Sequence, residues 1–346
     1  MVEKQPKGRQ TVTNVLLACG VFLGLVLSYF IALPFLPAIV WSFTLAVLFA
    51  PLDARLRKSF GSPGLSAGAT TAIVAVIVVV PTILVIGTLL NETVKSAPLI
   101  TSMVRSGTWA RVTADYPWLV PAADWLNARL NIPELIQAAT SWLAGWSGSF
   151  VKGSIAGLVS LLLTFYFLFY LLRDRNSAAA TVENLLPLSA SEFSLLGDRI
   201  VNTIFASVYG TATVATLQGG LGGAMFWWLD LPAPLFWGVV MGLLAVVPFL
   251  GAFVIWAPTA VVLALSGDFL SAALLTAWGV VVVGLVDNIL YPILVGKRLM
   301  MHTVPSFIAI AGGLVLFGPH GVVLGPIIAA GSQTLLEIWR SRTVTL

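Results

Sequence analysis

A few polar side chains stand inside or beside the apolar stretches of this sequence, and they define its possible chemistry. Asp287 and Asn288 come at the end of one apolar run, and Gln218 lies within another. An ionisable group at membrane depth is costly and usually faces a cavity or a pathway for ions or solutes. These residues predict a polar binding site. Two simpler interpretations stay open: Asp287 as an interfacial helix cap, and Gln218 as an interhelical hydrogen-bond donor.

Proline and glycine supply a second kind of polar group, the backbone itself. They interrupt the apolar segments 234–266 and 304–338. Proline removes a backbone donor, and a broken helix is tolerated in a membrane where protein or a water-filled cavity satisfies the freed groups. The predicted solute-binding residues are Gln218, Pro248, Phe249, Gly251, Asp287, Asn288, Gly318, Pro319 and Gly321. The predicted hinges are Pro258, Pro292, Gly296, Gly325 and Pro326.

The two interrupted segments resemble each other at a constant offset of 71 residues. Charged residues flank the first segment on the predicted outer side and the second on the inner side, so the two would enter from opposite faces. Paired interrupted helices of inverted topology indicate the binding site of a transporter. The identical pairs are Pro234 and Pro305, Phe236 and Phe307, Gly242 and Gly313, Leu243 and Leu314, and Pro248 and Pro319.

The elements that must position these residues are membrane helices. Hydrophobic residues make up 58% of the 346 residues, charged residues make up 9%, and the mean hydropathy is +0.99. A helix needs about 20 apolar residues to cross a bilayer. The sequence therefore predicts an all-α, polytopic membrane bundle with two broken or re-entrant hairpins in its C-terminal third. Four charge-free runs carry this prediction: Thr11–Phe35, Pro63–Leu90, Gly153–Leu172 and Phe269–Val286.

Lysine and arginine set the predicted orientation, because cytoplasmic loops carry an excess of both. Thirteen of the eighteen lie on one predicted side, so both termini should be cytoplasmic. The predicted organisation is N-terminal transmembrane helices at 1–90, an extracytoplasmic helical segment at 91–151, a transmembrane helix at 152–172, a cytoplasmic linker helix at 173–205, and a transport core at 206–346.

Two local patterns make finer predictions. Ser189 followed by Glu192 is a capping box, which begins a helix. Gly219-Gly220 and Gly222-Gly223 predict close helix packing in lipid rather than a phosphate-binding loop.

Other classes of site are not indicated. His302 and His320 lack partners at metal-ligand spacing, and there is no Walker loop. We predict no cofactor and no enzymatic activity. The net charge of +4 orients helices and does not indicate a nucleic-acid partner. Cys19 alone makes no internal disulfide, and the apolar run beyond it favours an uncleaved first helix over a lipoprotein signal.

The motifs of the C-terminal third resemble those of the autoinducer-2 exporter family. The similarity lies in Val247–Gly251 with Pro258, in Asp287–Pro292 with Gly296, and in the pattern ending at Gly325-Pro326. The resemblance implies a bacterial inner-membrane permease with about eight spanning helices that forms homo-oligomers. Some relatives are associated with export of autoinducer-2 and others with sodium/proton exchange.

Three functions remain open from the sequence. The first is a secondary transporter of a small polar solute, such as autoinducer-2, that works by alternating access with H⁺ or Na⁺ as coupling ion. The second is a sodium/proton antiporter in which Asp287 binds the ion. The third is a non-transporting membrane scaffold, against which the interrupted helices argue.

Overall fold

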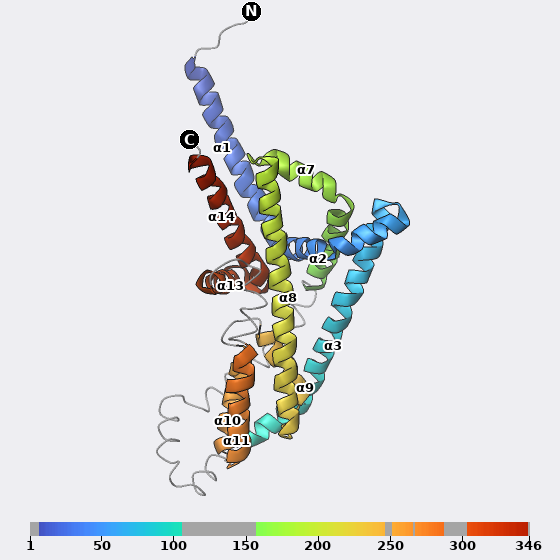
Figure 1. Ribbon diagram of the computed structural model, residues 1–346, viewed down its shortest axis with the longest axis vertical. Helices are drawn as coiled ribbons and strands as arrows, with labels where there is room; N and C mark the ends of the chain where they lie inside the picture. Colours follow the sequence, from blue (N-terminus) through green and yellow to red (C-terminus); the bar gives the residue numbers. More distant parts are fainter. Residues whose placement is uncertain (1–6, 106–156, 246–250, 266, 287–302, 345–346) are drawn as a thin grey trace, which may run out of the picture.

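The computed structural model describes residues 7–105, 157–245, 251–265, 267–286 and 303–344 (Figure 1). Within these ranges the elements are helices and there is no strand, so the predicted all-α class is confirmed. Both described ends of the chain, at the start of α1 and the end of α14, lie at the same end of the molecule (Figure 1).

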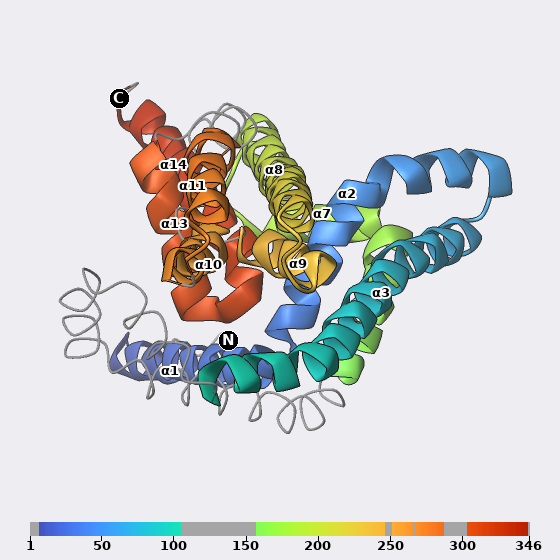
Figure 2. The same cartoon turned by 90° about the horizontal axis from the view of Figure 1, so that it is seen from below.

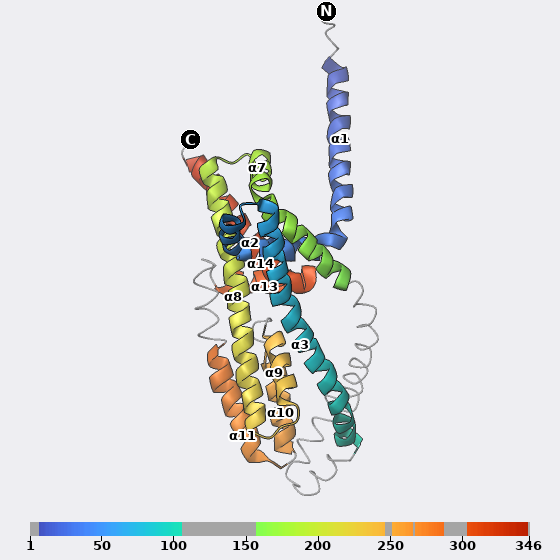
Figure 3. The ribbon, with the colours of Figure 1, turned by 90° about the vertical axis from the view of Figure 1, so that its right-hand side faces the viewer.

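The N-terminal part consists of α1 (Lys7–Ala32), the 3-10 turn η1 (Leu33–Phe35), α2 (Leu36–Phe60) and α3 (Pro63–Arg105). Gly61 ends α2 with a φ of 66°, and its N–H donates to the carbonyl of Arg57. Glycine adopts this left-handed backbone without steric cost. Helix α1 stands apart from the other helices, and most of its described side chains are exposed (Figure 3).

Helix α3 extends further than the sequence indicated. The apolar run ends near residue 90, but the helix continues to Arg105, into the segment assigned to 91–151. Hydropathy marks where a helix leaves lipid, and it does not mark where the helical backbone ends. The rest of the segment assigned to 91–151 lies outside the described residues from residue 106 onward.

The middle of the chain contains a sharp bend. Helix Gly157–Arg173 is followed at an angle of 83° by α7 (Arg175–Leu185). After a short turn, α8 (Ala190–Trp228) begins at the predicted capping box, which is confirmed: Ser189 Oγ accepts from the Glu192 N–H, and the Glu192 side chain accepts from the Ser189 N–H. At 39 residues, α8 joins the predicted linker helix and the next span in one helix.

The C-terminal helices gather around α8 (Figure 2). They are α9 (Pro234–Leu244), α10 (Phe253–Leu265), α11 (Phe269–Trp278) with the π-helical turn η3 (Gly279–Val283), α13 (Thr303–Phe317), the 3-10 turn η6 (Gly318–His320) and α14 (Gly321–Val344). One buried cluster joins α8, α9, α10 and α11, and its members include Phe226, Met241, Trp256 and Leu275. Helices α13 and α14 lie toward the opposite end of α8 (Figures 1 and 3).

Both predicted interruptions divide a helix. Helix α9 ends at Leu244 and α10 begins at Phe253, while α13 ends at Phe317 and Gly318 adopts a φ of 69°. With 11 and 13 residues, α9 and α10 extend about 16 and 20 Å, too little to cross a ~30 Å hydrocarbon core. The second hairpin differs, because α14 has 24 residues and extends about 36 Å.

The prolines at 258 and 326 do not break their helices. We expected Pro258 to interrupt the segment, but it lies inside α10, as Pro326 lies inside α14. Each is the sixth residue of its helix, where proline removes one hydrogen bond near the start and the following turns still form. Their role as hinges stays a prediction.

Four described helical stretches are long and apolar enough to cross a membrane, or five if the bent pair at residue 174 counts as one span. They are Leu16–Phe60, Pro63–Leu84, Ala190–Trp228 and Val304–Thr343. The first and last stretches each contain a 3-10 turn. The number of stretches is therefore not the number of membrane crossings. A total of eight crossings stays a prediction, and a multi-pass membrane protein is established.

Glycines allow α8 and α9 to pack closely against each other. A Cβ on Gly219 of α8 would lie 2.7 Å from the carbonyl oxygen of Gly238 of α9, and one on Gly223 would lie 3.2 Å from the Gly238 Cα. The predicted packing role is confirmed for Gly219, Gly222 and Gly223, but not for Gly220, where a Cβ would meet no atom within 4 Å. Small residues allow helix backbones in lipid to approach this closely.

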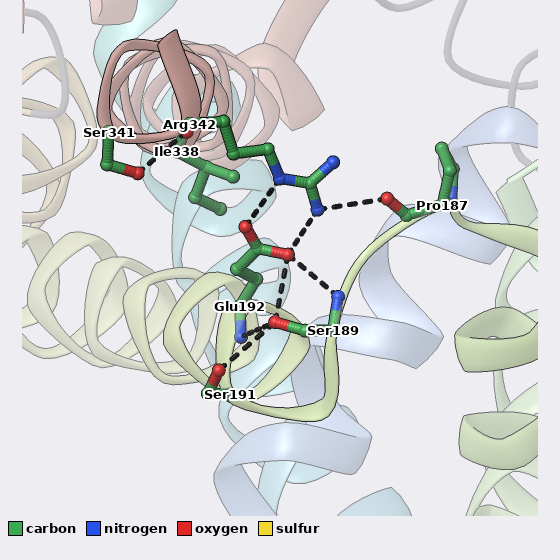
Figure 4. A network of polar contacts seen from close by, with 7 residues as sticks. All are labelled: Pro187, Ser189, Ser191, Glu192, Ile338, Ser341 and Arg342. Atoms are coloured by element: carbon green, nitrogen blue, oxygen red, sulfur yellow. Dashed lines mark hydrogen bonds and ion pairs between the residues drawn. The ribbon is translucent and has the colours of Figure 1, made fainter. Parts of the chain in front are cut away.

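A polar contact fixes the end of α14 to the start of α8 (Figure 4). Arg342 Nε donates to Glu192 Oε1 at 2.7 Å, Arg342 Nη2 pairs with Glu192 Oε2, and the same Nη2 donates to the carbonyl of Pro187 at 3.1 Å. The guanidinium of Arg342 and then the N–H of Ser189 lower the pKa of Glu192 to about 2. Charge-assisted bonds of this kind favour the ionised carboxylate.

Candidate functional site

Two predicted site residues, Gln218 of α8 and Gly251 just before α10, lie against each other beside the end of α9. Val214 of α8, Ala245 at the end of α9 and Val286 after η3 form one buried cluster. Gln218 is one helical turn beyond Val214 and is fully buried. We call Val214, Gln218, Ala245, Gly251 and Val286 the central cluster.

Gln218 and Gly251 lie directly against each other. A Cβ on Gly251 would be 3.0 Å from Gln218 Oε1 and 3.2 Å from the Ala245 Cα. A side chain at residue 251 would therefore crowd the buried amide of Gln218 and the backbone of Ala245. A buried amide beside a broken helix places hydrogen-bonding groups in surroundings that are otherwise apolar.

Two tryptophans support the central cluster from α10 and α11. Trp278 Nε1 donates to the carbonyl of Leu221 in α8 at 3.2 Å. Trp256 covers Gly279, where a Cβ would come within 2.7 Å of three atoms of the indole ring. Gly279 also begins the π-helical turn η3, a distortion that is common near functional sites. These contacts hold the chain that leads to Val286 against α8.

The second tip is held elsewhere in the fold. Gly318, Pro319 and His320 form η6, which contacts α2 as well as its own neighbours α13 and α14. Gly321 packs against the backbone of Gly313. None of the residues of this tip belongs to the central cluster. Their assignment to the solute site stays a prediction.

Six predicted site residues lie outside the described part of the chain. Four of them are predicted to bind solute and two are predicted hinges: Pro248, Phe249, Asp287, Asn288, Pro292 and Gly296. Ala245, Gly251 and Val286, which are near some of these residues in the sequence, are described and lie together.

Sequence reasoning missed one buried carboxylate. Asp53 of α2 is fully buried, with its Oδ2 3.4 Å from Arg57 Nη2 and 3.8 Å from Arg175 Nη1. We read the basic residues of this region only as markers of orientation. The available signal was the four-residue spacing of Asp53 and Arg57, which places both on one face of a helix.

In the described ranges, no group of three His, Cys, Asp or Glu side chains could hold a metal ion. What the geometry offers instead is a buried amide, small residues and an interrupted backbone.

The family model described as AI-2E family transporter matches residues 17–341. This match includes every helix from α2 to α13 and most of α1 and α14. The chain belongs to the AI-2E transporter family. It is a membrane transporter, and its family is one of transporters and not of enzymes.

Curated relatives agree with this assignment. A protein of Aquifex aeolicus named "Putative transport protein" is 25% identical, with 88% of this chain and 90% of the relative covered. YdiK of Escherichia coli, also named a putative transport protein, is 25% identical, with 91% and 87% covered. YrrI of Bacillus subtilis, named in the same way, is 27% identical over 64% of each chain.

Proposed function

We propose that this AI-2E family member is a secondary transporter of a small polar solute, with autoinducer-2 as the first candidate. The solute site is the central cluster together with the adjoining Asp287 and Asn288. Transport occurs by alternating access, in which the first hairpin moves against α8. The observation that carries this proposal is the burial of Gln218 against Gly251 at the tip of a hairpin too short to cross the membrane.

The free-energy cost of an interrupted hairpin tip supports a binding role for it. Backbone groups freed at a helix interruption at membrane depth are unfavourable unless polar groups satisfy them. A passive anchor would not need them, which argues against a scaffold. A solute rich in hydroxyl groups can bond to both the amide of Gln218 and the backbone around Gly251.

Solute flux into proteoliposomes tests this site. We expect Gly251→Leu to abolish uptake of autoinducer-2, because the larger side chain would displace the Gln218 amide. Gln218→Leu should also abolish it by removing the donor and acceptor. Gly220→Ala is the matched control, since its Cβ meets no atom within 4 Å. Unchanged uptake in both site variants, at equal protein levels, would exclude the central cluster.

The antiporter alternative depends on Asp287. In proteoliposomes that contain a pH-sensitive dye, a sodium/proton antiporter would acidify or alkalinise the lumen when Na⁺ is added, and Asp287→Asn would stop this response. Absence of any Na⁺-dependent response in the wild type, alongside solute uptake, favours the polar-solute transporter.

Two further proposals concern the environment of the protein. We place it in the bacterial inner membrane with both termini in the cytoplasm, which is supported by the positive-inside pattern and by the common position of the ends of α1 and α14. We also propose a homo-oligomer in the lipid bilayer, with H⁺ or Na⁺ as coupling ion. Cross-linking in native membranes tests the oligomer.

A further inference from the structure

One turn of α2 holds both sides of the bend between helix Gly157–Arg173 and α7. On the incoming side, Arg57 Nη2 donates to the carbonyl of Leu172 at 2.9 Å and to that of Arg173 at 3.4 Å. On the outgoing side, Asp53 Oδ2 lies 3.8 Å from Nη1 of Arg175, the first residue of α7. Two residues one turn apart on α2 therefore contact both helices that meet at 83°.

The burial of these groups is unequal. The Asp53 side chain is 0% exposed, whereas the side chains of Arg57 and Arg175 are 23% and 37% exposed. Among the described residues, neither oxygen of Asp53 accepts a hydrogen bond, so the two arginines are its ionic partners. A buried carboxylate without a cation nearby would be strongly unfavourable.

The two arginines are not equivalent partners. Arg57 belongs to the same helix as Asp53, at the favourable four-residue spacing, and stays with it whatever α7 does. Arg175 is on another helix and already contacts solvent. Arg175 can therefore separate from Asp53 without leaving a buried charge unpaired, which is the requirement for a reversible contact.

The remaining charges at the bend are paired with each other. Arg173 Nε and Nη2 donate to the two oxygens of Asp174 at 2.9 and 2.7 Å, and the Arg173 guanidinium lies 4.5 Å from the centre of the Tyr170 ring. Of the charges at the bend described here, Arg175 is thus the one that pairs with Asp53 from α7.

We propose that Asp53, Arg57 and Arg175 form an ionic latch between α2 and α7 that closes and opens during the transport cycle. This inference rests on the proposed alternating-access function. Helix α7 leads through a short turn into α8, which carries Gln218, so movement of α7 away from α2 is transmitted to the helix that bears the solute site. Asp53 acts as a positioning residue and does not touch the solute.

Pulsed electron paramagnetic resonance on the full chain tests the latch. Spin labels at Lys58 of α2 and Ala178 of α7, both exposed, report the separation of the two helices, in a Cys19→Ser background. The wild type is expected to show two distance populations. Asp53→Asn and Arg175→Gln should each deplete the shorter one, and Arg175→Lys should restore part of it. Arg55→Gln, on the exposed side of α2, is the matched control.

The outcomes separate the latch from the proposed function. Solute uptake should fall about tenfold in Asp53→Asn, within the usual range of coupling between sites. A single distance population in the wild type would show a static brace and overturn the proposal, as would variants that match Arg55→Gln. If the wild type moves no solute, the proposed function fails, and the distance populations still decide whether the latch opens.

Discussion

The two interrupted hairpins of the C-terminal third have small residues at the same spacing, but these residues pack against different helices. In the first, Gly238 and Gly242 of α9 face Gly219 and Gly223 of α8, the helix that precedes it. At the 71-residue offset, Ala309 and Gly313 occupy the same positions in α13. These face Gly321 and Gly325 of α14, the helix that follows.

This difference separates the roles of the hairpins. The second hairpin is closed on itself, and the far end of its long helix is fixed to Glu192 through Arg342. The first hairpin is attached to α8 and leaves its tip against Gln218. In the alternating-access mechanism proposed above, the first hairpin is the unit that moves and the second is the rigid support.

Among the variants considered below, the largest effect on stability is expected at Gly313. Gly313→Ala would place a methyl group into the backbone of Gly321 and Gly325, where no side chain can move aside, and we expect a loss of about 3 kcal/mol. Gly312→Ala is the control, because its Cβ meets no atom within 4 Å, and it should be neutral or stabilising. Unfolding in detergent measures both variants. Equal stabilities would contradict the closed second hairpin.

A smaller effect is expected where α9 meets α8. In Gly219→Ala the new methyl group would lie 2.7 Å from the Gly238 oxygen and 3.2 Å from the Gly242 Cα, so a small shift of α9 relieves the overlap. We expect a loss of about 2 kcal/mol. Gly220→Ala should show no loss in the same assay. A loss larger than that of Gly313→Ala would reverse the assignment of rigid and movable units.

A third variant concerns the support behind the first hairpin. Trp278→Phe keeps an aromatic ring but removes the donor to the Leu221 carbonyl, and we expect a loss of about 1 kcal/mol. Trp228→Phe is the control, since Trp228 is 65% exposed. If both substitutions have equal effects, the indole bond does not hold α11 to α8.

The smallest effect concerns pH and the anchor of the second hairpin. The pKa of Glu192 falls from 4.5 to about 2 on folding, so its contact with Arg342 stabilises the protein above pH 4.5 and is lost as the pH falls toward 2. The gap in unfolding temperature between the wild type and Arg342→Gln should therefore shrink across this window. A gap that stays constant would show that the ion pair contributes nothing.

The sequence was sufficient to predict those structural properties that depend on residues close together along the chain. Apolar runs identified the membrane helices, because burial in lipid depends on local hydropathy. Proline and glycine marked both interruptions, and Ser189 with Glu192 marked the start of α8, because backbone conformation and capping act within a few residues. Pro258 misled us because one missing hydrogen bond near a helix start does not end the helix.

The tertiary structure alone decided which surfaces meet. The glycine pattern of α9 and α13 is similar, yet one faces the preceding helix and the other the following helix. Asp53 pairs with Arg175, which is far away along the chain. Local propensity carries no information about such pairs, because their energy arises only when distant helices pack together. The contact of Gln218 with Gly251 is of the same kind, since it forms only when the hairpin tip folds back onto α8.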